Sequence, residues 1–101
     1  MKKLLPILVI LPLAASSWAW TGKMQFKKDG SEGIAVLESD SNTLCLSTIG
    51  QVEIVDHYYS TNSSMCVTSS IQLNDLYLTP RQTREEAIEM MEDNDFELIS
   101  G

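Results

Sequence analysis

The two cysteines of the chain, Cys45 and Cys66, constrain its fold more than any other feature. They lie about twenty residues apart, and most of the apolar alternation falls inside or beside this stretch. An even number of cysteines in an exported chain is typical of a disulfide, because compartments outside the cytoplasm are oxidising. We therefore predict that a Cys45–Cys66 disulfide joins a strand at 44–46 to a strand at 65–67. We expect it to hold the segment His57-Tyr58-Tyr59 in the core.

Two functional roles for the cysteines are less well supported. A thiol–disulfide oxidoreductase usually carries its cysteines close together, as in Cys-x-x-Cys, which this chain lacks. A structural zinc site needs four ligands, and the chain has only one histidine, His57, to add to the two thiols. We predict no cofactor and no metal.

The start of the chain has the layout of a secretory signal peptide. A basic start (1–3) precedes an apolar run (4–15) and a small-residue region with Ser17 and Ala19. A signal peptidase requires small side chains at the −3 and −1 positions, so we predict cleavage after Ala19. The apolar run is shorter than the roughly 20 residues that span a bilayer, which argues against a retained anchor.

Cleavage divides the chain into a signal peptide (1–19) and one small domain (20–101), which we expect to be secreted or periplasmic. Loss of Lys2 and Lys3 changes the net charge from −7 to −9. Such a negative domain repels nucleic acid and anionic membrane surfaces, so we predict neither as a partner and no stable membrane insertion. The charge suits a basic protein partner.

Period-2 alternation predicts most of the secondary structure. It begins at 23–27, returns at 34–38 after an Asp29-Gly30 turn, and continues in runs at 43–49 and 52–59. Shorter strands are expected at 65–68 and on both sides of Asn74-Asp75. We interpret the lysines at 23, 27 and 28 as protection of an exposed strand edge.

The pattern changes near the C-terminus. Both Thr79–Gln82 and Thr83–Glu86 match the capping box that opens a helix. Apolar residues then recur at helical spacing, Asn94 suits a left-handed C-cap, and 96–99 returns to alternation. The predicted fold class is therefore α+β, with a small, mostly antiparallel sheet of short strands, one C-terminal amphipathic helix and one disulfide.

Catalytic residues are not evident, and the sequence favours a non-enzymatic protein without excluding an enzyme. His57 follows Asp56, but adjacent strand residues face opposite sides and would not pair. No serine lies in a Gly-x-Ser-x-Gly elbow. We predict no catalytic residue, and interpret His57 as a strand residue with a solvated or core-satisfying role.

The helix carries the densest run of acids. Glu85, Glu89 and Glu92 fall near one helical face, and Asp93 follows them. The helix dipole does not stabilise carboxylates at the C-terminal end of a helix. The charges of Glu92 and Asp93 must therefore be stabilised by water or by a partner. A solvated face is the simpler explanation; these four residues are the candidate partner-binding site.

The leading hypothesis is an exported, small, acidic, non-enzymatic binding module, acting as an inhibitor, adaptor or accessory protein. Small size, export, acidity and the lack of an assembled active site support it. One alternative is a small secreted hydrolase that uses His57. Another is an envelope component that assembles through an open strand edge.

Overall fold

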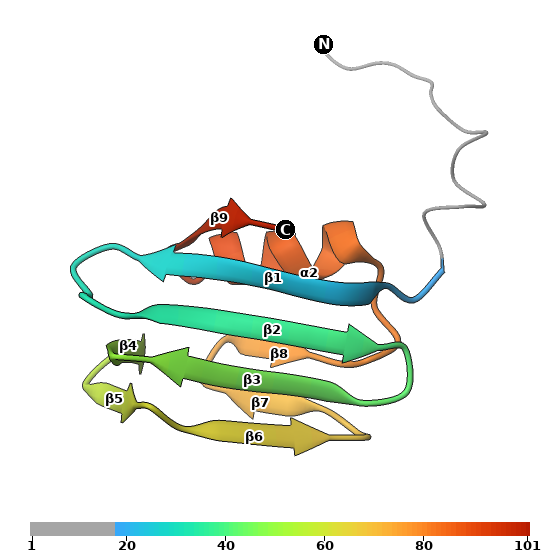
Figure 1. The fold of residues 1–101 in the computed structure, drawn as a ribbon, viewed down its shortest axis with the longest axis horizontal. Coiled ribbons are helices and arrows are strands. Elements are labelled where there is room, and N and C mark those ends of the chain that lie inside the picture. Colours follow the sequence, from blue (N-terminus) through green and yellow to red (C-terminus); the bar gives the residue numbers. More distant parts are fainter. Residues whose placement is uncertain (1–17) are drawn as a thin grey trace, which may run out of the picture.

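The computed structural model describes residues 18–101 (Figure 1). The predicted signal peptide therefore lies outside the described residues except for Trp18 and Ala19. Trp18 is exposed, whereas Trp20 is buried and opens the folded domain immediately before the first strand.

A five-stranded antiparallel sheet forms one layer of the domain (Figure 1). Its strands, in spatial order, are β6 (Ser64–Val67), β3 (Leu44–Ile49), β2 (Ile34–Asp40), β1 (Thr21–Lys28) and β9 (Phe96–Ser100). The first and last strands of the domain are thus neighbours, and β6 and β9 form the two edges of the sheet.

The second layer covers one face of this sheet (Figure 1). It consists of the hairpin β7 (Ile71–Leu73) and β8 (Leu76–Leu78), followed by the helix α2 (Arg84–Glu92). A further hairpin, β4 (Gln51–Val55) and β5 (Tyr58–Thr61), lies at one end of the sheet. Mostly antiparallel strands with one C-terminal helix confirm the predicted α+β class.

Alternation along the strands separates a core face from an outer face. Met24 and Phe26 of β1, and Leu44 and Leu46 of β3, point into the core between the two layers. The helix contributes its buried stripe from the other side. The fully buried side chains that fill this core include Phe26, Met24, Leu37, Leu44, Ile71, Leu76, Leu78, Met91 and Val52.

The predicted disulfide is confirmed, and it lies on the outer face of the sheet. Cys45 and Cys66 are direct partners across the β3–β6 ladder. Cys45 is half-buried and Cys66 is exposed, because both alternate with residues that face the core. The expectation that the bridge holds Tyr58 and Tyr59 in the core is wrong, since each tyrosine is 54% exposed.

The predicted strand over 52–59 is also wrong, because a tight turn at Asp56-His57 divides it into β4 and β5. His57 has a φ angle of 63°, in the left-handed region that histidine enters more readily than most residues. The exposed histidine is therefore a turn residue and not a strand residue.

Only one of the two capping boxes opens the helix. The Thr83 hydroxyl accepts from the Glu86 N–H at 3.1 Å, and the Glu86 carboxylate accepts from the Thr83 N–H at 2.9 Å. Thr79 lies in a turn instead, where its N–H donates to the Gln82 side chain and its hydroxyl accepts from the Arg81 N–H. Beyond the helix, the left-handed residue is Asp95 (φ 70°) and not the predicted Asn94. The Asn94 side-chain amide instead donates to the Met90 carbonyl.

The interpretation of the lysines as edge protection is wrong as well. Strand β1 lies between β2 and β9, so it is an inner strand. Lys23 and Lys27 are exposed on its outer face, whereas Lys28 is only 8% exposed.

Candidate functional site

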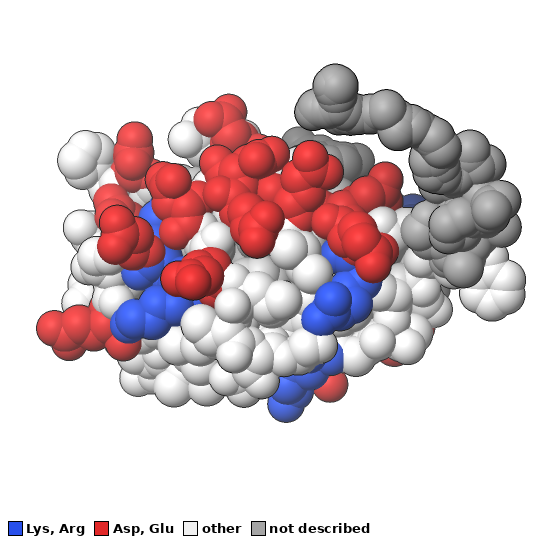
Figure 2. Space-filling model, turned by 90° about the horizontal axis from the view of Figure 1, so that it is seen from above, with Lys and Arg blue, Asp and Glu red and all other residues white. Residues whose placement is uncertain are grey.

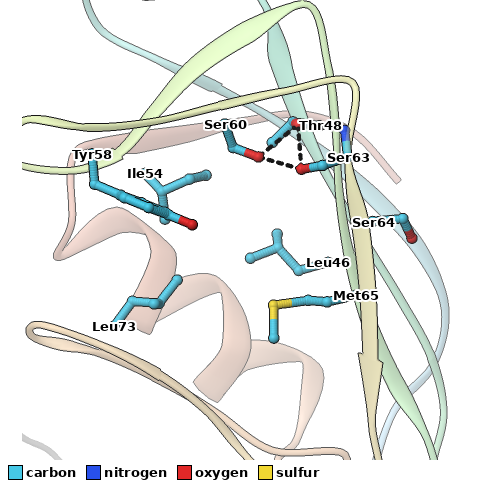
Figure 3. A pocket seen from close by; sticks show the side chains of 9 residues that line it. All are labelled: Leu46, Thr48, Ile54, Tyr58, Ser60, Ser63, Ser64, Met65 and Leu73. Atoms are coloured by element: carbon cyan, nitrogen blue, oxygen red, sulfur yellow. Dashed lines mark hydrogen bonds between the residues drawn. The ribbon is translucent and has the colours of Figure 1, made fainter.

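A pocket of about 300 Å³ opens where β3, β4, β5, β6 and β7 approach one another. Its apolar part is formed by Leu46, Ile54, Met65, Leu73 and the ring of Tyr58, whose side chains converge in Figure 3. Each of these elements supplies its pocket residue by strand alternation. The pocket is therefore a gap in the core between the sheet and the two hairpins.

Tyr58 and Met65 form the exposed rim of this pocket. Tyr58 is 54% exposed, and Met65 is 44% exposed. Tyrosine and methionine are enriched in protein interfaces, where tyrosine combines apolar area with a polar tip and methionine adapts its shape. Exposed side chains of this kind around an apolar pocket are typical of a binding site.

Three hydroxyl groups line the remaining side of the pocket and bond to one another (Figure 3). The Thr48 Oγ1 atom lies 3.2 Å from Ser60 Oγ and 3.5 Å from Ser63 Oγ, and the two serines are also bonded. Backbone bonds fix the cluster, since Thr48 N–H donates to the Ser63 carbonyl at 2.8 Å. A serine nucleophile needs an adjacent base, and no His, Asp, Glu or Lys lines this pocket.

His57 lies apart from these hydroxyls. Its backbone N–H donates to Glu53 Oε2 at 3.0 Å across the β4–β5 turn. The structure shows no hydrogen bond of its imidazole within residues 18–101, and the histidine does not line the pocket. The side chains that a hydrolase would need are therefore not brought together around His57.

The predicted acidic residues lie on the exposed side of α2 and at its C-terminal end. Glu85, Glu89, Glu92 and Asp93 are all exposed, and we call them the acidic surface. Figure 2 shows acids gathered across the side of the molecule that carries α2 and β9. Glu86 has a separate structural role, because its carboxylate completes the capping box.

Asp93 also lines a small polar pocket of about 150 Å³. The pocket contains the buried Lys28 and the polar side chains of Asp56, Asn74, Asp75, Asp93, Asn94 and Asp95. Lys28 Nζ donates to the Ile54 carbonyl at 3.4 Å and lies over the ring of Phe96. Among the described residues, no three metal-ligating side chains are placed to hold a metal ion.

The apolar pocket and the acidic surface are separate. The pocket is at the β6 edge of the sheet, whereas β9 and α2 are at the opposite edge. Sequence reasoning singled out the acidic residues, whose role as a binding site stays a prediction, and it missed the pocket. A signal was present: residues 58–74 carry no charged side chain in an otherwise acidic chain. Such a stretch indicates a surface kept free of charge.

The chain matches no family model, no curated protein and no solved structure in comparisons with known proteins. Within the part of the chain that the structure describes, no helix is long and apolar enough to cross a membrane.

Proposed function

We propose that the protein is an exported, non-enzymatic binding module with a positively charged protein partner. The observation that carries this proposal is the open apolar pocket of about 300 Å³ with Tyr58 and Met65 on its rim. Apolar pockets with a few polar groups are the usual form of a recognition site. The hydroxyls of the pocket already bond to one another, which suits recognition better than nucleophilic attack.

The acidic surface supports the proposed charge of the partner. Glu85, Glu89, Glu92 and Asp93 project from one side of the molecule, and the whole chain has a net charge of −7. A field of one sign accelerates the approach of an oppositely charged protein and weakens as salt is added. In this proposal, the acidic surface attracts the partner, and the pocket provides apolar contact.

A secreted or periplasmic location is part of the same proposal. The disulfide is consistent with an oxidising compartment. Within residues 18–101 the first buried side chain is that of Trp20, so cleavage after Ala19 would remove no buried residue of this range. Mass spectrometry of the exported protein should find Trp20 at its N-terminus; a start at Met1 would contradict cleavage.

An envelope component that assembles through a strand edge is a second candidate, because β6 is an open edge of the sheet. Size-exclusion chromatography with light scattering separates the two candidates. A monomer at micromolar concentration supports a binding module, whereas an ordered oligomer supports assembly.

Partner capture tests the proposed function. The purified domain, immobilised and exposed to a periplasmic or secreted extract, should retain a specific partner that is released by added salt. The variant Glu85→Gln/Glu89→Gln/Glu92→Gln/Asp93→Asn should lose most of this capture. A control, Glu32→Gln/Glu38→Gln, removes two exposed acids elsewhere and should retain it. Equal capture by both variants, or no specific capture at all, would contradict the proposal.

A further inference from the structure

Strand β6 is a short edge strand that lacks three of the usual protections, which are charge, proline and a bulge. Its residues, Ser64–Val67, include no charge and no proline, and its register with β3 is continuous. The other edge, β9, carries Glu97 and a register shift opposite β1. Natural sheets normally block an open edge by charge, proline or a bulge. An unblocked edge next to a pocket is the arrangement that accepts an added strand.

The hydrogen-bonding pattern shows which backbone groups of β6 face outward. Thr48 N–H donates to the Ser63 carbonyl, and bonded and non-bonded pairs alternate along an antiparallel ladder. Met65 and Val67 therefore bond to β3, whereas the N–H and carbonyl groups of Ser64 and Cys66 face away from it. The short Cα–Cα distance of 4.0 Å between Cys45 and Cys66 agrees, because non-bonded pairs lie closer together.

The pocket lies on the core-facing side of this edge. Met65 shares that side with Leu46, and both line the pocket, whereas Ser64 points away in Figure 3. A strand added to β6 would lie about 4.8 Å from it, with alternate side chains on the same side as Met65. One of those side chains would enter the pocket, whose volume suits a leucine, isoleucine or phenylalanine.

The charges around the edge indicate what kind of strand would bind. No charged side chain of either sign lines the pocket, but the charged residues of the β4–β5 hairpin, which supplies Ile54 and Tyr58, are the acids Glu53 and Asp56. The Arg81 guanidinium donates to the Thr68 and Ser69 carbonyls, just beyond the last residue of β6. A second copy of the chain would bring another net charge of −7 to the edge, which opposes self-pairing.

We propose that the β6 edge binds an extended, positively charged peptide segment of the partner by strand addition, with one large apolar side chain in the pocket. This inference rests on the proposed function and names the partner's binding element. Backbone hydrogen bonds to Ser64 and Cys66 would supply affinity, and the pocket would supply specificity.

The test begins with the disulfide-bonded domain and a displayed library of random heptapeptides. Selection should enrich peptides that combine Lys or Arg with an apolar residue. Ser64→Pro removes an outward N–H that β3 does not use, and Met65→Lys adds a positive charge to the rim. Each variant should weaken binding of the selected peptide about tenfold or more, which corresponds to about 1.4 kcal/mol.

Matched controls separate strand addition from loss of folding. Ser47→Ala removes the Ser47–Ser64 hydroxyl bond that Ser64→Pro also loses. Tyr77→Lys places the same charge at a residue that is 45% exposed but outside the pocket. Both controls should bind the peptide within about twofold of the unmodified domain, and thermal melts should show all four variants folded. Backbone N-methylation should weaken binding when it blocks the alternate peptide N–H groups that face β6. Methylation of the intervening residues, whose N–H groups face away from β6, should not weaken it.

Three results would overturn the inference. The first is a library with no enriched cationic peptide, and the second is peptide binding unaffected by Ser64→Pro and Met65→Lys. The third is a dimer that Ser64→Pro dissociates, which would assign the edge to a second copy. Salt-sensitive capture that depends on the acidic surface but not on Ser64 or Met65 would leave the proposed function standing while this inference fails.

Discussion

Lys28 and Phe96 are direct partners across the β1–β9 ladder, and the Lys28 ammonium lies 5.1 Å from the centroid of the Phe96 ring. A cation over an aromatic face is stabilised most when it is shielded from water, as the buried Lys28 is.

A double-mutant cycle of Lys28→Met and Phe96→Leu should measure this interaction. We expect a coupling free energy of about 0.5–2 kcal/mol in denaturant unfolding. Lys27→Met is the matched control, because the Lys27 ammonium donates to the Ser31 carbonyl on the exposed side. Its cycle with Phe96→Leu should be additive within about 0.5 kcal/mol. Equal coupling free energies in the two cycles would contradict a specific cation–π interaction between Lys28 and Phe96.

Reduction of the Cys45–Cys66 disulfide should lower the stability of the domain substantially. The bridge joins residues 21 positions apart, and opening such a loop in the unfolded state corresponds to about 3 kcal/mol. For a domain of this size, that loss lowers the Tm by about 10 °C or more. Scanning calorimetry with and without a reducing agent measures the shift.

A control for that experiment weakens the same ladder without opening the loop. Ser47→Ala/Ser64→Ala removes one hydroxyl bond of 3.1 Å between β3 and β6. We expect it to cost about 1 kcal/mol or less. An unchanged melt after reduction, or two titratable thiols in the native protein, would be incompatible with a stabilising bridge.

Gly33 should not tolerate a side chain, because the β1–β2 loop crosses the backbone between β3 and β4 there. A Cβ atom at Gly33 would overlap the Ile49 carbonyl oxygen and would lie 2.7 Å from the Gly50 carbonyl carbon. Gly33→Ala should destabilise the domain by roughly 2–4 kcal/mol in denaturant unfolding, since backbone must move.

Gly30→Ala is the comparison for this substitution. A Cβ atom added to Gly30 would meet no heavy atom within 4 Å, and the φ angle of +85° is the source of strain. Its cost should be about 1–2 kcal/mol, from backbone conformation alone. A smaller loss for Gly33→Ala than for Gly30→Ala would mean that the loop relaxes away from β3 and β4.

Asp40 should make the domain sensitive to acid. The backbone N–H of Thr43 donates to Asp40 Oδ1 at 2.6 Å and that of Asn42 at 2.9 Å, and these bonds hold the pKa of Asp40 below its usual value of 3.8. A lowered pKa in the folded state favours folding above the unfolded-state pKa. That contribution is lost as the pH falls through the folded-state pKa.

The substitution Asp40→Asn tests whether the ionised Asp40 side chain stabilises the folded domain at neutral pH. Asparagine can still accept a hydrogen bond but carries no charge, so the unmodified domain should be the more stable one at pH 7. The difference should shrink as the pH is lowered below about 4. Denaturant unfolding between pH 7 and pH 2 measures it, and a difference that stays constant over this range would contradict the prediction.

The sequence predicted those features of the fold that depend on local pattern. The alternation at Met24 and Phe26, the disulfide and the Thr83 capping box were all confirmed. The alternation and the capping box depend on residues only a few positions apart. The disulfide could be predicted because two cysteines allow only one pairing. The fold class followed, because strands before a helix in a small chain leave few arrangements.

The errors arose where tertiary position decided between local alternatives. His57 could continue a strand by composition, but the polar Asp56-His57 pair was used as a turn. The lysines of β1 resembled edge protection because nothing local shows that the distant β9 pairs with β1. The pocket at Met65 and Leu73 joins residues from five strands, so no spacing along the chain could reveal it.

The pairing of β1 with β9 also determines when folding can finish. A chain is synthesised with its N-terminus first, yet β1 remains without one neighbour until Phe96–Ser100 has emerged. Strand β9, the last of the described strands, thus completes the sheet that β1 begins. Such an arrangement delays completion of the sheet until β9 has been synthesised, so the described domain cannot close strand by strand as it leaves the ribosome.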